Sequence, residues 1–218
     1  MVTIPGIFDI PDRTVQSGTC GCEGERRAKE QAGHERKLRE REDRLRKSGI
    51  PEAYWGIPED TTYLEAIESG GLFIHGKVGR GKTWLSVTSM KGWMNRHRNE
   101  RAVFTDAMSF FSHIRRSYDG GDSEREAMWH FIGAKLLVFD DFAKGRPSEW
   151  AIERIEDLVQ ERYVSNRPTI FTSQWAGTAL IDRLAEGGSP ESAEAIVSRI
   201  VQRCKMVELT GPDRRMAH

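Results

Sequence analysis

The chain has 218 residues, of which 38% are hydrophobic and 30% are charged, and its formal net charge at neutral pH is zero. This composition excludes a disordered or membrane-embedded chain and predicts one globular domain with an appendage. The balanced charge gives no global attraction for nucleic acid, and no apolar stretch is long enough to span a bilayer, so we expect a cytoplasmic protein without a membrane partner.

Residues 1–48 are expected to form an extension ahead of the main domain. The first two dozen residues are rich in Pro, Gly, Asp and Thr and lack periodicity, which predicts an irregular and partly mobile start. Residues 23–47 then alternate acidic with basic side chains at helical spacing and predict a solvated helix. That helix is interpreted either as an exposed connector or as a docking arm for another protein.

Three cysteines, Cys20, Cys22 and Cys204, are too few for a disulfide framework, which agrees with a reducing compartment. Cys20 and Cys22 leave a zinc site open, with His34 as a further ligand. A structural zinc ion needs four ligands and the sequence has no second cysteine pair, so two loop thiols are the favoured interpretation.

Strands and helices alternate through the main domain, residues 49–218, after Gly-Pro breaks at residues 48–51 and 56–58. The expected strands are residues 71–75, 101–105, 136–139, 169–172 and 206–209. The expected helices are residues 84–94, 107–118, 149–163, 178–185 and 193–204. This alternation predicts an α/β fold with a five-stranded parallel sheet and helices on both of its faces.

A glycine-rich loop, Gly76-Lys77-Val78-Gly79-Arg80-Gly81-Lys82-Thr83, lies between the first expected strand and the helix that begins at Trp84. Its glycines let backbone N–H groups converge on phosphate oxygens, and the helix presents its positive end to the same anion. Lys82 adds a charge for the outer phosphates, and Thr83 offers a hydroxyl to Mg²⁺. We therefore expect residues 76–84 to bind a nucleotide, the alternative being an ordinary glycine turn.

Two carboxylates, Asp140 and Asp141, follow the apolar strand 136–139. In a parallel sheet the carboxyl end of a strand is where a ligand binds, so we expect Asp140 to lie beside Mg²⁺. Asp141 is expected to orient or deprotonate the attacking water. The alternative is a helix cap or an acidic turn after a buried strand.

Polar side chains also end the fourth expected strand, at Thr172, Ser173 and Gln174, from where they could reach the outer phosphate or the attacking water. The alternative is a capped turn between strand and helix. Arg199 and Arg203 lie four residues apart and share one face of the last helix. They are interpreted either as arginines acting on a neighbouring subunit's nucleotide or as ordinary surface charges.

The order of these motifs resembles the AAA+ helicase-loader family, which comprises the DnaC and DnaI proteins of bacteria and phages and the related IstB transposition helpers. The resemblance covers roughly residues 49–215. It is carried by Gly49-Ile50-Pro51, the loop of residues 76–83, Leu137-Val138-Phe139-Asp140-Asp141-Phe142, Arg162-Tyr163, Pro168-Thr169-Ile170-Phe171-Thr172-Ser173-Gln174, Ser198-Arg199-Ile200 and Arg203.

The resemblance implies an AAA+ P-loop NTPase fold with a reduced or absent C-terminal lid, and ATP with Mg²⁺ as its ligands. It places Gln174, where the family usually has Asn, at the sensor-1 position. Arg203 is similar to the arginine finger with Arg199 beside it, and Arg215 is similar to the sensor-2 arginine, with Arg214 as its competitor.

The resemblance further implies an ATPase that loads a hexameric replicative helicase onto single-stranded DNA and assembles into a ring or spiral on ATP and DNA. Arg115, Arg116 and Tyr118 offer two cations and a ring to a DNA strand, the alternative being a surface helix with a chance basic pair. An IstB-like helper that binds duplex DNA and delivers a transposase is the second interpretation. A small-molecule kinase is disfavoured, because the paired carboxylates suit an activated water.

Overall fold

The computed structural model describes residues 23–120, 123–145 and 147–213. The chain divides into two compact units after Asp43, so the last turn of the first helix belongs to the second unit. None of the helices in these residues combines the length and apolar character that a membrane crossing needs.

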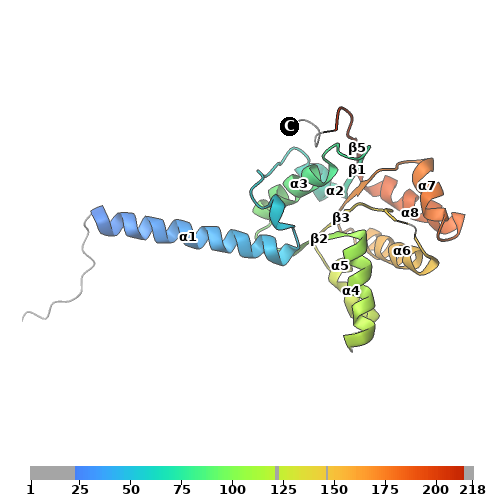
Figure 1. Cartoon of the computed structure of the whole chain (residues 1–218), viewed down its shortest axis with the longest axis horizontal. Coiled ribbons are helices and arrows are strands. Elements are labelled where there is room, and N and C mark those ends of the chain that lie inside the picture. The colour runs from blue at the N-terminus through green and yellow to red at the C-terminus, as the bar shows by residue number, and fades with distance from the viewer. Residues whose placement is uncertain (1–22, 121–122, 146, 214–218) are drawn as a thin grey trace, which may run out of the picture. The chain divides into compact units, whose positions relative to one another are not determined.

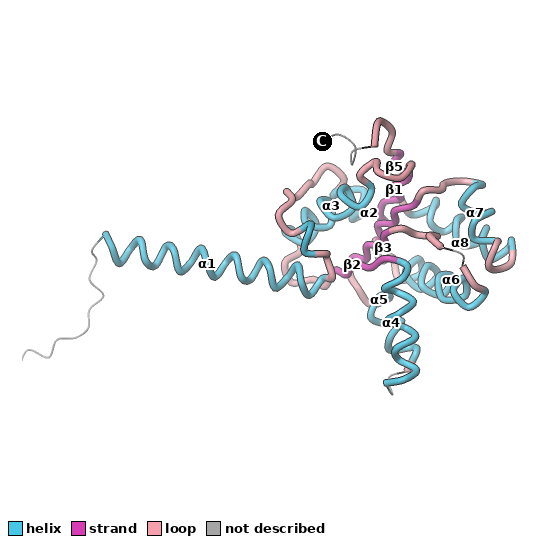
Figure 2. The backbone as a smooth tube through the Cα atoms, in the orientation of Figure 1, coloured by secondary structure: helices cyan, strands magenta, loops and turns pink. Residues whose placement is uncertain are grey.

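Five parallel strands form one sheet within the described residues of the second unit, in the order β2-β3-β4-β1-β5 (Figure 1, Figure 2). Their bounds are β1 Gly71–His75, β2 Ala102–Asp106, β3 Leu136–Asp140, β4 Thr169–Ser173 and β5 Lys205–Glu208. The predicted five-stranded parallel sheet is therefore confirmed. The expected bounds of β2 and β5 were wrong by one residue, and β3 and β4 each run one residue further than expected.

The helical segments are α1 Glu23–Ser48, the 3-10 turn η1 Glu52–Tyr54, α2 Leu64–Ser69, α3 Lys82–Arg96, α4 Ala107–Gly120, α5 Glu124–Ile132, α6 Glu149–Val164, α7 Thr178–Ala185 and α8 Pro190–Arg203. Three of them, η1, α2 and α5, were not predicted from the sequence. A readable signal preceded α5, because Ser123 and Glu126 form a reciprocal capping box at its start. Helix α8 begins three residues earlier than expected, since Ser189 caps it and Pro190 occupies its first turn.

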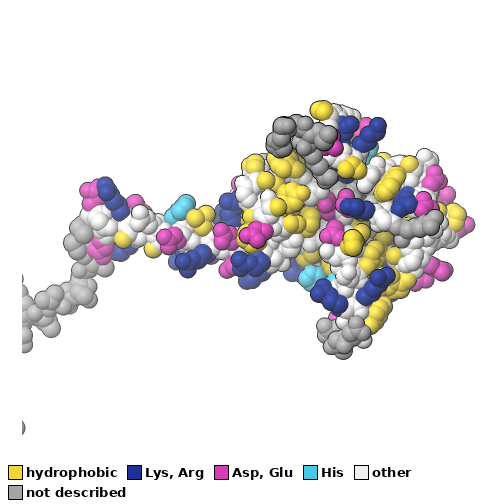
Figure 3. Space-filling view, viewed as in Figure 1, with side chains coloured by type: hydrophobic (Ala, Val, Ile, Leu, Met, Phe, Trp, Pro, Cys, Tyr) yellow, Lys and Arg dark blue, Asp and Glu magenta, His cyan; other side chains and the backbone are white. Residues whose placement is uncertain are grey.

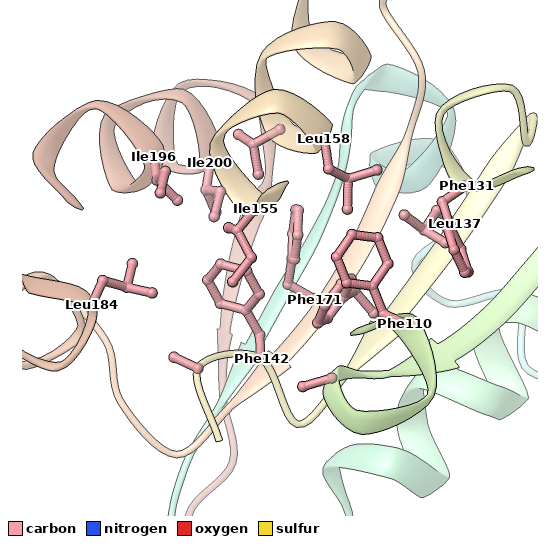
Figure 4. Packing of buried hydrophobic residues seen from close by; sticks show 14 of the residues in the cluster. Phe110, Phe131, Leu137, Phe142, Ile155, Leu158, Phe171, Leu184, Ile196 and Ile200 are labelled. Carbon is pink, nitrogen blue, oxygen red and sulfur yellow. The ribbon is translucent and has the colours of Figure 1, made fainter. Parts of the chain in front are cut away.

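Alternate residues of each central strand face opposite sides of the sheet. On one side Leu72 and Val138 pack with α2 and α3. On the other side Phe73 and Phe139 pack with α4 to α8, and Figure 4 shows the centre of this layer around Phe171. Because both faces are covered, the central strands read in sequence as continuous apolar runs.

Charged side chains of both signs alternate along α1 (Figure 3). Ion pairs four residues apart join Arg27 to Glu23, Lys29 to Glu25 and Arg36 to Glu40. Exposed pairs of this kind contribute about 0.3–0.5 kcal/mol each. The predicted solvated helix is therefore present, and these pairs contribute modestly to its stability.

Candidate functional site

The glycine-rich loop joins the carboxyl end of β1 to the amino end of α3. Gly76, Gly79 and Gly81 have φ angles of +146°, +79° and +88°, which L side chains rarely adopt. A Cβ atom at Gly76 would also collide with the backbone oxygen of Leu209. These positions therefore need glycine, and the loop curls tightly ahead of the first turn of α3, the end of a helix that favours an anion.

Lys82 directs its ammonium group into this loop. The side chain is 7% exposed, and Nζ donates to the backbone oxygens of Gly76 at 2.7 Å and Lys77 at 3.0 Å. The loop therefore holds a positive charge at its concave side, where phosphate oxygens would be attracted.

A chain of hydrogen bonds joins α3, β3 and β4 at the carboxyl edge of the sheet. The Thr83 hydroxyl donates to Oδ2 of Asp140 at 2.8 Å. The Thr172 hydroxyl donates to Oδ1 of the same carboxylate at 2.6 Å. Thr172 in turn accepts the backbone N–H of Asp141 at 2.9 Å. Asp140 is thereby fixed beside the loop with both of its oxygens oriented.

The pKa of the Asp140 carboxyl is raised from its usual value of 3.8, chiefly because the group is buried. Hydrogen bonds from Thr172 and Thr83 oppose this shift, and the neighbouring charges of Asp141 and Asp106 add to it. A buried carboxylate of this kind gains most from a bound cation, which would replace the water it has lost.

Asp106 was missed by the sequence analysis, although it ends an apolar strand in the same pattern as Asp140. The register of β2 and β3 pairs Asp106 with Asp140. Asp106 also begins α4, accepting the backbone N–H and the hydroxyl of Ser109 at 2.9 Å each. It therefore adds negative charge to the site while its own oxygens cap a helix.

Asp141 adopts a left-handed backbone conformation with φ of +52°, which is uncommon for a residue with a side chain. Its Oδ2 accepts a hydrogen bond from Nζ of Lys144 at 2.5 Å. That bond is the main cause of the raised pKa of Lys144. Lys144, which no sequence motif indicated, thus holds the second carboxylate in place.

A cavity of about 520 Å³ opens beside the loop and the two carboxylates. Its lining residues are Tyr54, Val78, Gly79, Gly81, Lys82, Thr83, Trp84, Asp141, Lys144 and Gln174. Gln174 therefore lies where it could contact an outer phosphate. Lys77 takes part through its carbonyl oxygen, and Arg80 keeps one guanidinium nitrogen buried without a hydrogen-bond partner in the described residues.

Thr172 holds a carboxylate, while Ser173 fits the alternative of a capped turn after β4, because its hydroxyl accepts the backbone N–H of Trp175 at 3.2 Å. Both side chains are 0% exposed. Thr172 holds Asp140, and the Ser173 hydroxyl donates to the backbone oxygen of Phe142 at 3.0 Å. These two hydroxyls position the carboxylates and their strand, and neither lines the cavity.

Arg199 and Arg203 lie near the amino ends of the strands, whereas the glycine-rich loop lies at their carboxyl ends. They line a small cavity together with Gly70 and Thr169, which stand at the amino ends of β1 and β4. The five residues of β1 span about 16 Å between the amino ends and the carboxyl ends of the strands. Neither arginine can therefore reach the loop of its own chain, and any action on a nucleotide would be on another subunit's.

Arg115, Arg116 and Tyr118 end α4, away from the loop. The Arg115 guanidinium lies over the Trp150 ring at 5.0 Å, and Arg116 Nε donates to its own helix at 3.3 Å. The Tyr118 hydroxyl bonds to the carboxylate of Glu124. Each of these three side chains therefore already contacts another residue of the chain.

Several expected residues lie outside the described part of the chain: Cys20, Cys22, Arg214 and Arg215. The described chain ends at Asp213, whose carboxylate stands so close to Gly79 that a Cβ there would collide with it. In the described residues, no three His, Cys, Asp or Glu side chains gather as metal ligands.

The donor groups at this edge fit Mg²⁺ and a nucleotide triphosphate. A threonine hydroxyl and a buried carboxylate are the hard oxygen donors that Mg²⁺ takes in nucleotide sites, where water and phosphate complete its shell. The loop, the Lys82 ammonium and the start of α3 supply the opposite charge for phosphates. The arrangement can therefore bind a triphosphate and set a carboxylate, Asp141, beside it.

Comparisons with known proteins identify the family of this chain. The family described as IstB-like ATP binding protein matches residues 63–218. A Mycobacterium tuberculosis protein named as an ATP-binding protein in an insertion sequence is 24% identical over 156 residues, which are 70% of this chain and 58% of that protein. An insertion sequence ATP-binding protein of Sinorhizobium fredii is 26% identical over 150 residues, which are 66% of this chain and 56% of that protein.

The chain thus spans between half and three-fifths of the length of these curated relatives. Among solved structures, the DnaC helicase loader superposes with a TM-score of 0.60 at 22% identity, over 73% of this chain and all of that one. That similarity shows that the two chains share a fold.

Proposed function

The chain belongs to the family of IstB-like ATP-binding proteins, and we propose that it hydrolyses ATP at this site and thereby loads a hexameric replicative helicase onto single-stranded DNA. The observation that carries the hydrolysis is the placement of Asp140 against Thr83 at 2.8 Å, with Asp141 lining the adjoining cavity. Binding alone would not need the second carboxylate, whereas hydrolysis needs a group that can orient water.

Each residue has a part in the proposed reaction. Thr83 and Asp140 would hold Mg²⁺, which supplies charge neutralisation at the phosphate oxygens when bound. Lys82 would place its ammonium against the outer phosphates. Asp141 would orient the attacking water and accept its proton, while Lys144 keeps that carboxylate at the cavity wall. Gln174 would donate its amide to the outer phosphate.

Coupling to assembly is proposed through the arginines at the far edge. Arg203, with Arg199 beside it, would complete the site of a neighbouring subunit in a ring or spiral, because neither can serve its own. Arg215 or Arg214 would act as the second sensor. Hydrolysis would then be fast only in the assembled protein.

The proposed partners, a hexameric helicase and single-stranded DNA, are assigned to different parts of the chain. Residues 49–218 would form the ATPase domain, and residues 1–48, which include the charged α1, would form the arm that holds the helicase, although the last turn of α1 packs with the second unit. Arg115, Arg116 and Tyr118 are proposed as contacts for single-stranded DNA, with the rings and cations that such a strand requires. The likeness to the DnaC helicase loader supports this client as an analogy of fold.

A transposition helper is the second candidate, favoured by the names of the two curated relatives, both of insertion sequences. The ATP chemistry would be identical, and duplex DNA would replace single-stranded DNA. The client would be a transposase instead of a helicase.

The deciding experiment is a pull-down from the source cell with the tagged full chain, ATP and Mg²⁺. Lys82→Ala, which removes the loop ammonium, is the matched control. Nucleotide-dependent recovery of a hexameric helicase supports the loader. Recovery of a transposase, or of duplex DNA alone, replaces the loader with the transposition helper, and equal recovery with Lys82→Ala contradicts an ATP-dependent client.

A further inference from the structure

A buried lysine on α3, outside the glycine-rich loop, fastens another segment of the chain to the nucleotide cavity. Lys91 is 4% exposed. Its Nζ donates to the backbone oxygens of Tyr54 at 2.8 Å, Trp55 at 2.9 Å and Ile57 at 2.6 Å. An ammonium group has three protons, and these three acceptors match them. The side chain thus clamps the turn that contains Tyr54.

Further contacts hold the same segment on α3. The backbone N–H of Asp60 donates to the backbone oxygen of Thr88 at 2.9 Å. A Cβ atom at Gly92 would collide with the backbone oxygen of Asp60, so the two backbones touch. The indole N–H of Trp55 donates to the Ile50 oxygen at 2.8 Å, which closes the turn on itself. Lys91 therefore acts within a segment already laid along the helix.

The clamped turn reaches the nucleotide cavity at Tyr54. Tyr54 lines that cavity together with Val78 and Trp84. Side chains on a helix tilt toward its amino end, so Lys91 reaches back from about two and a half turns along α3 toward the loop. The same turn is therefore held by Lys91 and contributes Tyr54 to the cavity wall.

The wall formed by Tyr54, Val78 and Trp84 differs chemically from the phosphate side of the cavity. Val78 is 49% exposed and Trp84 is 38% exposed, so apolar surface faces the open part of the cavity. With the phosphates on the loop, as proposed, this wall borders the part of the cavity left for the sugar and base. Aromatic rings there offer a face on which a base can stack.

We propose that Tyr54 contacts the base of the bound nucleotide and that Lys91 is a positioning residue that holds Tyr54 in the cavity wall. The inference rests on the proposed nucleotide site and adds a base subsite to it. In this proposal the η1 turn and α3 bind the base, and the glycine-rich loop binds the phosphates.

Calorimetric titration of the full chain with ATP and with inorganic tripolyphosphate, both with Mg²⁺, separates these two parts, because tripolyphosphate carries the phosphates without a base. Lys91→Met and Tyr54→Ala should each weaken ATP binding about tenfold and leave tripolyphosphate binding within about twofold. Tyr54→Phe keeps the ring and should bind ATP as the wild type does. Lys135→Met, at an exposed position, is the matched lysine control.

Several outcomes would overturn the inference. Equal weakening of both ligands by Lys91→Met would make the clamp merely structural. Unchanged ATP affinity in Tyr54→Ala, which removes only a cavity side chain, would eliminate the base contact even where Lys91→Met fails to fold. A wild-type chain that binds neither ligand would refute the proposed function itself, whereas the first two results leave that function standing.

Discussion

The hydroxyl of Thr172 is predicted to stabilise the fold and to prepare the metal site at the same time. Its side chain is 0% exposed. It donates to Oδ1 of Asp140 at 2.6 Å and accepts the backbone N–H of Asp141 at 2.9 Å. Thr172→Val keeps nearly the same shape and removes both hydrogen bonds, which leaves a buried carboxylate oxygen and a buried N–H without partners.

Each orphaned buried group costs about 1–3 kcal/mol, and the lost bond to a charged acceptor lies toward the upper end. We therefore expect Thr172→Val to lower the free energy of unfolding by about 2–6 kcal/mol, a large share of the roughly 5–15 kcal/mol of a typical domain. The same change should raise the Mg²⁺ concentration needed for ATP binding, because Asp140 loses one of the two hydroxyls that orient it.

Thr88→Val is the matched control. Thr88 is also 0% exposed, but its hydroxyl donates only to the Leu85 oxygen of its own helix, at 3.0 Å. That oxygen accepts a helical backbone bond as well, so the loss should stay below about 1 kcal/mol. Urea unfolding of both variants measures the difference. Equal destabilisation, or an unchanged Mg²⁺ requirement in Thr172→Val, would refute the reasoning.

Three further predictions concern the reaction. Asp141→Asn should keep ATP affinity and slow turnover by about 10²–10⁴-fold, measured by phosphate release; an unchanged rate removes Asp141 from the mechanism. Because burial raises the pKa of Asp140, protons should displace Mg²⁺ at higher pH than from an exposed aspartate, so Mg²⁺-dependent ATP binding is present above that raised pKa and lost as pH falls through it. Measuring ATP affinity between about pH 4 and 8, with Mg²⁺ and with a chelator in its place, tests this. An equal loss of affinity in the chelator would contradict a role for Mg²⁺ at Asp140. Arg203→Ala should lower the rate of the assembled protein by about 10³-fold, and mixing with Lys82→Ala should restore part of it; no recovery in any mixture would contradict action between subunits.

The features that could be predicted from the sequence are those set by residues close together along the chain. The glycine-rich loop was recognisable because its glycines, Lys82 and Thr83 are contiguous, and the φ angles of Gly79 and Gly81 are a local property. The strands were recognisable because a strand buried on both faces is an unbroken apolar run, as in residues 136–139 of β3. Short elements such as α2 escaped, since six residues carry too little periodicity to distinguish helix from turn.

The partners of the site residues could not be read from sequence, because they depend on which strands lie side by side. The order β2-β3-β4-β1-β5 places β4 between β3 and β1, and so brings Thr172 against Asp140 across 32 positions in the sequence. The register of β2 and β3 adds Asp106 to the same edge. Strand order follows from covering both faces of the sheet with helices, a property of the whole fold.

By itself, then, the amino-acid sequence determined the class of fold, the phosphate loop and the carboxylates that face it, since each of these depends on neighbours along the chain. Only the tertiary structure decided that Arg203 lies an entire strand away from the glycine-rich loop of its own chain, and that Lys91 binds the backbone oxygen of Tyr54, a residue that lines the cavity beside that loop. Those relations join residues distant in sequence, and packing of helices against the sheet is what sets their distances.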